Sequence, residues 1–255
     1  MNSARLLRTL TAAAVFVSGL AVAAPASAAT TITRVVFSDD FSGDRGTAPD
    51  PAKWVPQDDG DQDDGDQDDG DQDDASLDGE GNVTLDDPLR TVRTFASSNG
   101  HAEARIKPGR EYGAWRALAV LDESGQLPAG QVEPLADDRV NPDEFHTYTI
   151  DWTATSIVWS VDGTKVLRFT PAESGKPFHL VLNVTMGERR SPDVVVDSVR
   201  VTVKVTVATK PWKKFTTYKA GQYVTYKDVA YRVRERHTSL PGWQPSLVPA
   251  LFQKI

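Results

Sequence analysis

The chain has 255 residues, of which 39% are hydrophobic and 25% are charged, and its formal net charge at pH 7 is −8. This length and apolar content allow one sizeable core together with a small additional domain. Because the chain has no cysteine, disulfides and thiolate metal sites are excluded, and the fold has to rest on side-chain packing or on ions bound by oxygen.

The first 28 residues have the pattern of an export signal. Arg5 and Arg8 precede an apolar run that ends in the small residues Ala26-Ser27-Ala28. We predict a signal peptide over residues 1–28, cleaved after about Ala28, and a mature protein that is secreted to the extracellular space. No other segment is long and apolar enough to span a bilayer, so no membrane partner is expected.

The negative charge is concentrated in one repeat. Residues 57–74 read QDDGDQDDGDQDDGDQDD and contain eleven aspartates and no apolar residue. Such a segment cannot offset the entropy lost on ordering, so we expect a disordered, solvated loop. Its period of five does not match an EF-hand loop, which needs aspartates at alternate positions and glycine at the sixth; weak cation binding along the repeat remains an alternative.

Strand patterns dominate the chain after the repeat. The β-rich runs are FHTYTIDW, SIVWSVDGTKVLRF, FHLVLNVT and DVVVDSVRVTVKVTV, and several of them alternate apolar with polar residues. Asp162-Gly163 is a hairpin-turn signal between two strands. Since no amphipathic helix is evident, the sequence predicts an all-β protein built as an antiparallel β-sandwich, with one face of each sheet buried.

A domain boundary is predicted at about Val207–Pro211. The last alternating run stops at ATKPW, because Pro211 ends strand pairing there and the composition becomes basic and aromatic. We therefore expect a sandwich over residues 29–207 and a small C-terminal β module over residues 208–255.

The C-terminal segment holds more aromatic side chains than so small a core can bury. Tyr223, Tyr226 and Tyr231 fall in strand-like runs and are expected in the core. Trp243 lies between glycine and glutamine in HTSLPGWQPSLVPALF, a stretch with three prolines and no strand or helix periodicity. A rigid loop position at the surface is therefore expected for Trp243.

This whole segment resembles the small chitin-binding module of bacterial chitinases, carbohydrate-binding module families 5 and 12. The resemblance is carried by Trp212, YKAGQYVTY, Tyr231 and HTSLPGWQPSLVPALFQKI. It implies that Trp243 stacks on a flat polysaccharide surface, and that this contact is shaped by residues around it, namely Thr238, Pro245 and Pro249.

The segment departs from the family pattern at two positions. Asp228 stands where the family usually has a turn glycine, and aspartate tolerates the left-handed region better than most residues. Phe252 stands where the family usually has a tryptophan, at a position that we expect in the core.

Sugar binding suits this residue type better than the alternatives. An indole face covers the axial C–H face of a β-linked sugar, and after association costs a micromolar affinity is expected. Residues 208–255 carry nine lysines and arginines against Asp228 and Glu235. No nucleic-acid partner is expected, because the chain is exported and has no known nucleic-acid motif; anionic wall polymers remain as an electrostatic supplement.

Five segments between about Val36 and Val201 resemble, in order, family-16 glycoside hydrolases, the laminarinase and lichenase group of β-glucanases. The segments include VVFSDDFSGDRGTAPDPAKWVPQ, ASLDGEGNVTL, SNGHAEARIKPGREYGAWRALAVL, DEFHTYTIDWTATSIVWSVDGTKV and PFHLVLNVTMG. The resemblance implies a curved jelly-roll (concanavalin-like) β-sandwich, which agrees with the strand patterns.

The catalytic motif that this resemblance implies is missing. Retaining glycosidases use two carboxyls about 5–5.5 Å apart, and the family supplies them from one strand as Glu-x-Asp-x-Glu or Glu-x-Asp-x-x-Glu. None of the nine glutamates here is followed two residues later by aspartate. Between GAWRALAVL and DEFHTYTIDW only a short connection remains, so we predict that the catalytic strand has been deleted. The cleft-lining tryptophan of the family is also lost, since Ala119 takes its place.

No catalytic residue is therefore assigned, although two glutamates remain as candidates for relocated catalysis. Glu103 matches the glutamate of the family segment EARIK, and Glu123 lies in the shortened connection. No cofactor is expected, because the four histidines show no metal-ligand spacing. The occasional structural Ca²⁺ of the family would use Asp40.

Together these patterns predict a secreted, monomeric protein that attaches to insoluble β-linked polysaccharide, with chitin as the first candidate, and whose glucanase-like domain is inactive. One alternative is an active secreted β-glucanase that hydrolyses O-glycosyl bonds with relocated carboxylates. Another is a non-enzymatic acidic cell-wall component in which the Asp-rich repeat is the functional part.

Overall fold

The computed structural model of the chain describes residues 28–57, 75–96, 98–109, 114–183 and 194–255. All but the last residue of the predicted signal peptide, and residues 58–74 of the Asp-rich repeat, lie outside the described residues. The chain divides into two compact units. Thr31–Thr206 form the sandwich, and Val207–Ile255, the C-terminal module, belong to the second unit.

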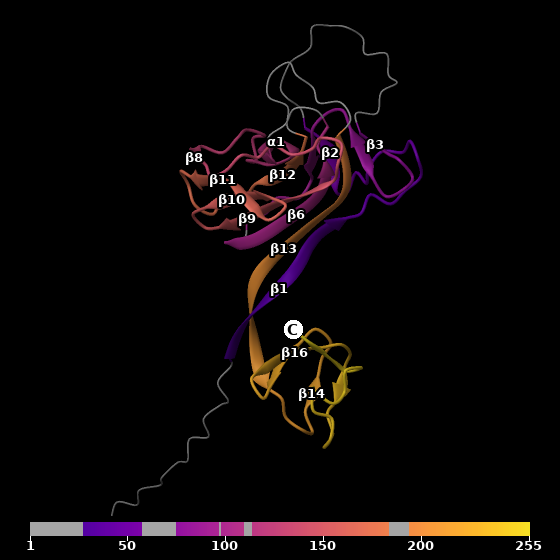
Figure 1. Cartoon of the computed structure of the whole chain (residues 1–255). Coiled ribbons are helices and arrows are strands. Elements are labelled where there is room, and N and C mark those ends of the chain that lie inside the picture. The colour runs from indigo at the N-terminus through magenta and orange to yellow at the C-terminus, as the bar shows by residue number, and fades with distance from the viewer. Residues whose placement is uncertain (1–27, 58–74, 97, 110–113, 184–193) are drawn as a thin grey trace, which may run out of the picture. The chain divides into compact units, whose positions relative to one another are not determined.

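Almost all regular structure is β-strand, which confirms the predicted class (Figure 1). The one described helix, α1 (Ala114–Ala117), has four residues, and the described part of the chain contains no helix able to cross a bilayer. The strands, in chain order, are β1 (Ala28–Asp39), β2 (Trp54–Pro56), β3 (Ala75–Leu77), β4 (Val83–Leu85), β5 (Leu89–Thr91), β6 (Asn99–Lys107), β7 (Leu118–Leu121), β8 (Gly130–Pro134), β9 (His146–Thr153), β10 (Ile157–Val161), β11 (Thr164–Pro171), β12 (His179–Leu182), β13 (Val194–Pro211), β14 (Thr217–Tyr218), β15 (Tyr223–Tyr226), β16 (Val229–Val233), β17 (His237–Thr238) and β18 (Phe252–Lys254).

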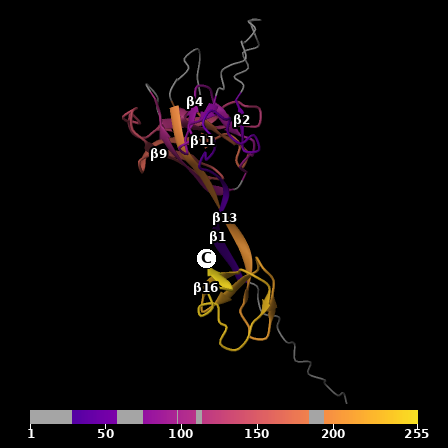
Figure 2. The ribbon, with the colours of Figure 1, turned by 90° about the vertical axis from the view of Figure 1, so that its right-hand side faces the viewer.

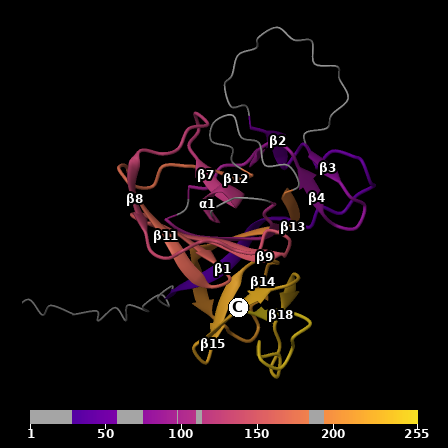
Figure 3. The same ribbon diagram turned by 45° about the horizontal axis from the view of Figure 1, so that its top comes forward.

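Two sheets form the sandwich. The larger sheet has the order β8-β11-β10-β9-β6-β13, and all of these neighbours pair antiparallel. β1 and β4 also pair with β13, and β1 lies beside β13 in both Figure 1 and Figure 2. The smaller sheet has the order β2-β5-β12-β7, in which β7 is the last strand; β7 and β12 lie side by side in Figure 3.

Strand alternation builds the core between the sheets. In β6, Ala102, Ala104 and Ile106 are buried, whereas Glu103 and Arg105 between them are exposed. In the smaller sheet the inward side chains of β7 and β12 belong to the same core: Leu118, Val120, Leu180 and Leu182. An aromatic group, formed by Phe37, Trp54, Phe95, Trp152 and Phe178, joins this core through edge-on and tilted ring contacts.

The hairpin between β10 and β11 turns at Asp162-Gly163, as predicted. Both residues have a positive φ, 48° and 81°, which is the backbone of the two-residue turn that matches strand twist. Glycine takes this conformation without steric cost, and aspartate is among the residues that tolerate it.

The module is organised separately. β15, β16 and β18 pair antiparallel, β14 pairs with β17, and Tyr218, Val224, Tyr231, Val233 and Phe252 form its core. One pair departs from the antiparallel prediction, since Lys210 and Pro211 at the end of β13 pair in parallel with β15. Proline is tolerated there because the hydrogen bond to the Thr225 carbonyl of β15 comes from the N–H of the next residue, Trp212, at 2.8 Å.

Asp162 also holds a charged contact beside the hairpin. Its Oδ1 accepts a hydrogen bond from the Thr147 N–H at 2.9 Å, and its Oδ2 lies 2.7 Å from Nδ1 of the half-buried His146. Nε2 of His146 lies 2.9 Å from the Asn141 carbonyl oxygen, so both ring nitrogens face acceptors. Burial lowers the pKa of His146, but these acceptors outweigh it and leave the pKa raised. Burial likewise opposes the hydrogen bonds at Asp162, whose pKa is lowered overall.

Replacing Asp162 with asparagine tests this pair, because asparagine keeps the turn and the acceptor for Thr147 but removes the charge. The raised pKa of His146 gives stability that is present below its ordinary value of 6.5 and is lost as the pH rises through the folded value. The lowered pKa of Asp162 gives stability that is lost as the pH falls below 3.8 toward the folded value. The free energy of unfolding of the wild type should therefore exceed that of Asp162→Asn most at about pH 5. The difference should be less than about 1 kcal/mol, because Asp162 is exposed. Urea unfolding at about pH 2.5, 5 and 9 measures this, and a difference that grows toward pH 9 would contradict it.

Candidate functional site

Trp243 lies on the surface of the module, with 37% of its area exposed. Its N–H donates to the Leu240 carbonyl at 3.0 Å, which closes a four-residue turn through Pro241 and Gly242. Gly242 has a φ of 87°, and proline followed by such a glycine is typical of a type II turn. The local sequence LPGW therefore determines where the indole leaves the backbone.

The inner side of the indole contacts the aromatic core of the module. The His237 ring lies 6.4 Å from the Trp243 ring, and it packs edge-on against Phe252 with 4.9 Å between the centroids. Phe252 is only 2% exposed, which confirms its predicted core position. Nδ1 of His237 lies 2.9 Å from the Glu235 carbonyl oxygen, which fixes the orientation of the imidazole. The indole is thus supported from below while part of it stays in water.

The other three residues predicted to shape the contact differ in burial. Thr238 is exposed, and its hydroxyl lies 2.9 Å from that of Thr217 across the β14–β17 pair. Pro249 is also exposed. Pro245 is buried, so it holds the loop after Trp243 in place and is not itself available to a ligand.

The three tyrosines and Asp228 lie where strand alternation and turn preference predict, with the exception of Tyr223. Tyr231 is buried in the core and Tyr226 packs against it, as predicted. Tyr223 is half-buried and does not belong to that core, because it lies on the opposite face of β15 from Val224. Asp228 has a φ of 61°, so it does occupy the left-handed position at which the family uses glycine.

Phe215 is 65% exposed, although no sequence pattern marked it as a site residue. It lies in the loop between β13 and β14, where no apolar alternation marks it. The large apolar residues exposed on the loops of the module are Phe215, Leu240, Trp243 and Leu247, and we call these four residues the apolar strip. The sequence feature that could have indicated an exposed Phe215 is an aromatic residue within a polar loop, KKFTT.

The outer face of the smaller sheet carries no carboxylate among its described residues. The outward side chains there are those that alternate with the core residues of β5, β7 and β12: Arg90, Ala119, Leu121, His179 and Val181. Nδ1 of His179 lies 2.6 Å from the Thr91 carbonyl oxygen, and its Nε2 lies 3.4 Å from Arg90. Beyond β7 no described strand extends this sheet, because the next strand, β8, belongs to the larger sheet.

The two remaining candidate acids lie in different places. Glu103 is on the outer face of the larger sheet, in the middle of β6, with its carboxylate 3.9 Å from the His101 ring. Glu123 is exposed in the loop between β7 and β8. It lines a cavity of about 370 Å³ together with Asp122 and Glu173, and Glu103 is not part of that lining. The structure therefore does not bring Glu103 and Glu123 together.

Two of the three carboxyls beside this cavity, those of Asp122 and Glu173, are already engaged in structural contacts. Oδ1 of Asp122 accepts hydrogen bonds from the Ser124 hydroxyl and from the N–H groups of Ser124 and Gln126, and these contacts lower the pKa of Asp122. Glu173 forms an ion pair with Lys176 at 2.9 Å. A general acid needs a raised pKa, whereas the shifted carboxyl pKa values among the described residues, those of Asp40, Asp78, Asp122 and Asp162, are all lowered.

Asp40, the candidate calcium ligand, is exposed and accepts hydrogen bonds at one carboxylate oxygen from the N–H and the hydroxyl of Ser42. These hydrogen bonds lower its pKa. Calcium takes six to eight oxygen ligands, and the described residues contain no group of three acidic, histidine or cysteine side chains that could hold a metal. Because calcium is also bound by backbone carbonyl oxygens, the calcium role of Asp40 stays a prediction.

Comparison with known families matches two parts of the chain. Residues 211–253 match carbohydrate-binding module family 5/12, and residues 134–189 match glycosyl hydrolases family 16. The first match contains Trp243 and the loop that holds it, and the second contains β9 to β12 of the sandwich.

Two curated relatives are chitinases by name. Chitinase A1 of Niallia circulans is 34% identical over 180 residues, which cover 69% of this chain and 24% of that protein. Chitinase Chi52 of Paenibacillus xylanexedens is 44% identical over 48 residues, or 19% of this chain and 9% of that protein. The chain thus spans less than a quarter of the length of these relatives.

A solved structure supports the fold of the sandwich. SCLam, described as a non-specific endo-β-1,3(4)-glucanase from family GH16, matches with a TM-score of 0.51 and 19% identity, over 71% of this chain and 96% of that chain. At this identity the likeness concerns the fold alone, and it confirms the predicted jelly-roll sandwich.

Truncating Trp243 and Phe252 separately tests the different positions of the two rings. Trp243→Ala should lower the free energy of unfolding by about 1–2 kcal/mol, because 37% of the residue is already in water although its inner side packs on His237. Phe252→Ala should cost about 3–5 kcal/mol, because it empties the core of the module. Thermal or urea unfolding of both variants measures this; equal losses would place the Trp243 ring in the core.

Proposed function

Because the chain joins a family-16 glycosyl hydrolase-type domain to a family-5/12 carbohydrate-binding module, we propose that it is a secreted protein that attaches to insoluble β-linked polysaccharide without hydrolysing it. The attachment site is the surface around Trp243, and chitin is the ligand that we propose. The observation that carries this proposal is a partly exposed indole held by a rigid turn within a carbohydrate-binding module.

The geometry of Trp243 suits a flat ligand. The turn fixes the backbone, and His237, which itself packs on Phe252, supports the inner side of the ring, so little rotamer freedom is left to lose on binding. Removing an aromatic face from water costs little free energy, and the face covers the apolar C–H face of a sugar ring. Preorganisation of this kind lets a few contacts yield micromolar affinity.

The choice of chitin rests on the relatives. Three similar proteins, among them the two named above, are chitinases by name, and residues 211–253 of this chain match carbohydrate-binding module family 5/12. Chitin is a β-linked chain with flat faces, which suits a ring presented on a loop. The basic charge of residues 208–255 adds attraction to any anionic polymer present with it.

Three features support an inactive sandwich. The smaller sheet ends at β7 among the described residues, at the place where the family would continue with its catalytic strand. The outward side chains on that sheet are apolar or basic. Glu103 and Glu123 lie on separate elements, whereas a retaining pair must lie about 5–5.5 Å apart. Ala119, which is buried, also removes an aromatic platform from this face.

Export is part of the proposal because of the amino-terminal pattern. Two arginines, an apolar run and Ala26-Ser27-Ala28 have the order of a secretory signal. An extracellular protein meets insoluble polysaccharide, whereas a protein retained in the cytoplasm does not.

A pull-down on insoluble chitin tests the binding. Wild-type protein should sediment with chitin, and Trp243→Ala should bind at least about thirtyfold more weakly, because a central aromatic contact is worth about 2 kcal/mol or more. Val132→Ala, which removes another exposed apolar side chain but from the sandwich, serves as the matched control and should bind as the wild type does. The proposal is wrong if the wild type remains in the supernatant, and Trp243 is not the contact if Trp243→Ala sediments equally well.

An assay of reducing ends tests the absence of hydrolysis. Purified protein incubated with laminarin, lichenan or chitin should release no more reducing ends than buffer does, because the two candidate acids, Glu103 and Glu123, lie on separate elements and do not form a retaining pair. Release that is abolished in Glu103→Gln or Glu123→Gln would overturn the inactive assignment in favour of relocated carboxylates. Release that survives in the double variant would place the activity elsewhere and would also contradict the proposal.

A further inference from the structure

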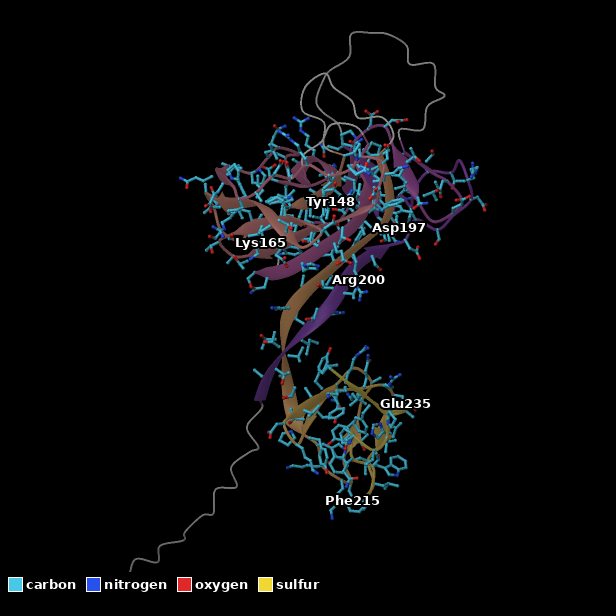
Figure 4. All side chains as sticks on the ribbon, in the orientation of Figure 1. Tyr148, Lys165, Asp197, Arg200, Phe215 and Glu235 are labelled. Atoms are coloured by element: carbon cyan, nitrogen blue, oxygen red, sulfur yellow. The ribbon has the colours of Figure 1, made fainter. Side chains whose placement is uncertain are left out.

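Phe215 combines two properties that rarely occur together. It is 65% exposed, more than Trp243, and Figure 4 shows it at the outer edge of the module. Its φ is 58°, in the left-handed region that disfavours residues with a bulky side chain. A folded protein holds an aromatic residue in this conformation only where its surroundings over-determine it.

Phe41 shows how such strain is normally compensated. It also has a positive φ, 47°, but it is only 2% exposed and its ring stacks on Trp54 at 5.6 Å. The free energy gained by packing the Phe41 ring in the core therefore offsets its backbone strain. At Phe215 the ring is mostly in water, and the Lys214 ammonium lies over it at 5.8 Å from the ring centroid. The folded protein gains little from the Phe215 ring itself.

The backbone around Phe215 is nevertheless firmly held. The Phe215 N–H donates to the Ser239 carbonyl at 2.6 Å, and the Ser239 N–H donates to the Thr216 carbonyl at 3.0 Å. The Ser239 hydroxyl donates to the Lys213 carbonyl at 2.7 Å, and the Lys213 N–H donates to the Tyr218 hydroxyl at 2.7 Å. Ser239 is fully buried, so this clamp is shielded from water. The loop thus presents the ring rigidly.

The same clamp connects Phe215 with the Trp243 turn. Ser239 accepts the N–H of Phe215, and the next residue, Leu240, accepts the N–H of Trp243. Leu240 is itself exposed. Two exposed rings are therefore anchored on two consecutive residues of one loop, and together with Leu247 they make up the apolar strip.

We infer that Phe215 is a second polysaccharide-contacting residue, which stacks on a sugar of the same flat face that Trp243 binds. This inference rests on the proposed function of the module. A surface with two rings contacts more of an extended, insoluble chain than one indole does. The exposed Phe215 ring makes a favourable apolar contact only when a ligand covers it. Lys214 is exposed and has a flexible side chain, so it can move from the ring when sugar binds.

Phe215→Asn separates binding from folding. Asparagine is tolerated in the left-handed region, so the variant should melt at the same temperature as the wild type or higher. It should bind insoluble chitin about three- to tenfold more weakly, because one stacking contact is lost. Phe215→Tyr keeps a ring and should keep the affinity. Asp228→Gly is the matched control, since it relieves a positive φ of 61° in a turn outside the apolar strip and should leave the chitin affinity unchanged.

Binding isotherms on chitin and melting curves of these variants decide the matter. If Phe215→Asn binds as the wild type does while Trp243→Ala loses binding, Phe215 is not a contact and the proposed function stands. If Phe215→Asn lowers the melting temperature, the ring has a structural role and the inference is wrong. If the wild type itself does not bind, both proposals fall together.

Discussion

The contact of the Trp243 indole with His237, and of His237 with Phe252, decides what the module can do. A tryptophan on an unsupported loop would turn onto its own protein, because its apolar area favours burial. Here the turn through Pro241 and Gly242 fixes the backbone, and the imidazole and the buried phenyl ring fill the space beneath the indole. The outer part of the ring is therefore kept in water, ready for a flat ligand.

The sandwich follows a different constraint. Both faces of β7 are buried, as are those of its neighbour β12, although β7 is the last described strand of its antiparallel sheet, where one exposed face is common. The outward residues Ala119, Leu121 and Val181 form a small cluster of their own instead of lining a polar cleft. Among the described residues this face carries no acid that could protonate a leaving group or attack a sugar. The likeness to the glucanase structure therefore concerns the fold of the sandwich.

Several site residues could be predicted because their chemistry is local. The turn at Asp162-Gly163, the left-handed Asp228 and the core position of Phe252 follow from residue type and immediate neighbours. Phe215 and Pro245 could not be predicted in this way. The exposure of Phe215 depends on Ser239, which lies 24 residues later in the chain. The burial of Pro245 depends on how the loop after Trp243 closes over the module.

The sequence by itself determined the all-β class, the two-part organisation of its patterns and the lack of a Glu-x-Asp-x-Glu strand, because strand alternation, composition and motif spacing are properties of neighbouring residues. Only the tertiary structure decided that Phe215 reaches water, that the end of β13 pairs in parallel with β15, and that Glu103 and Glu123 lie on separate elements. These features depend on contacts between residues far apart in the chain, which no local pattern encodes.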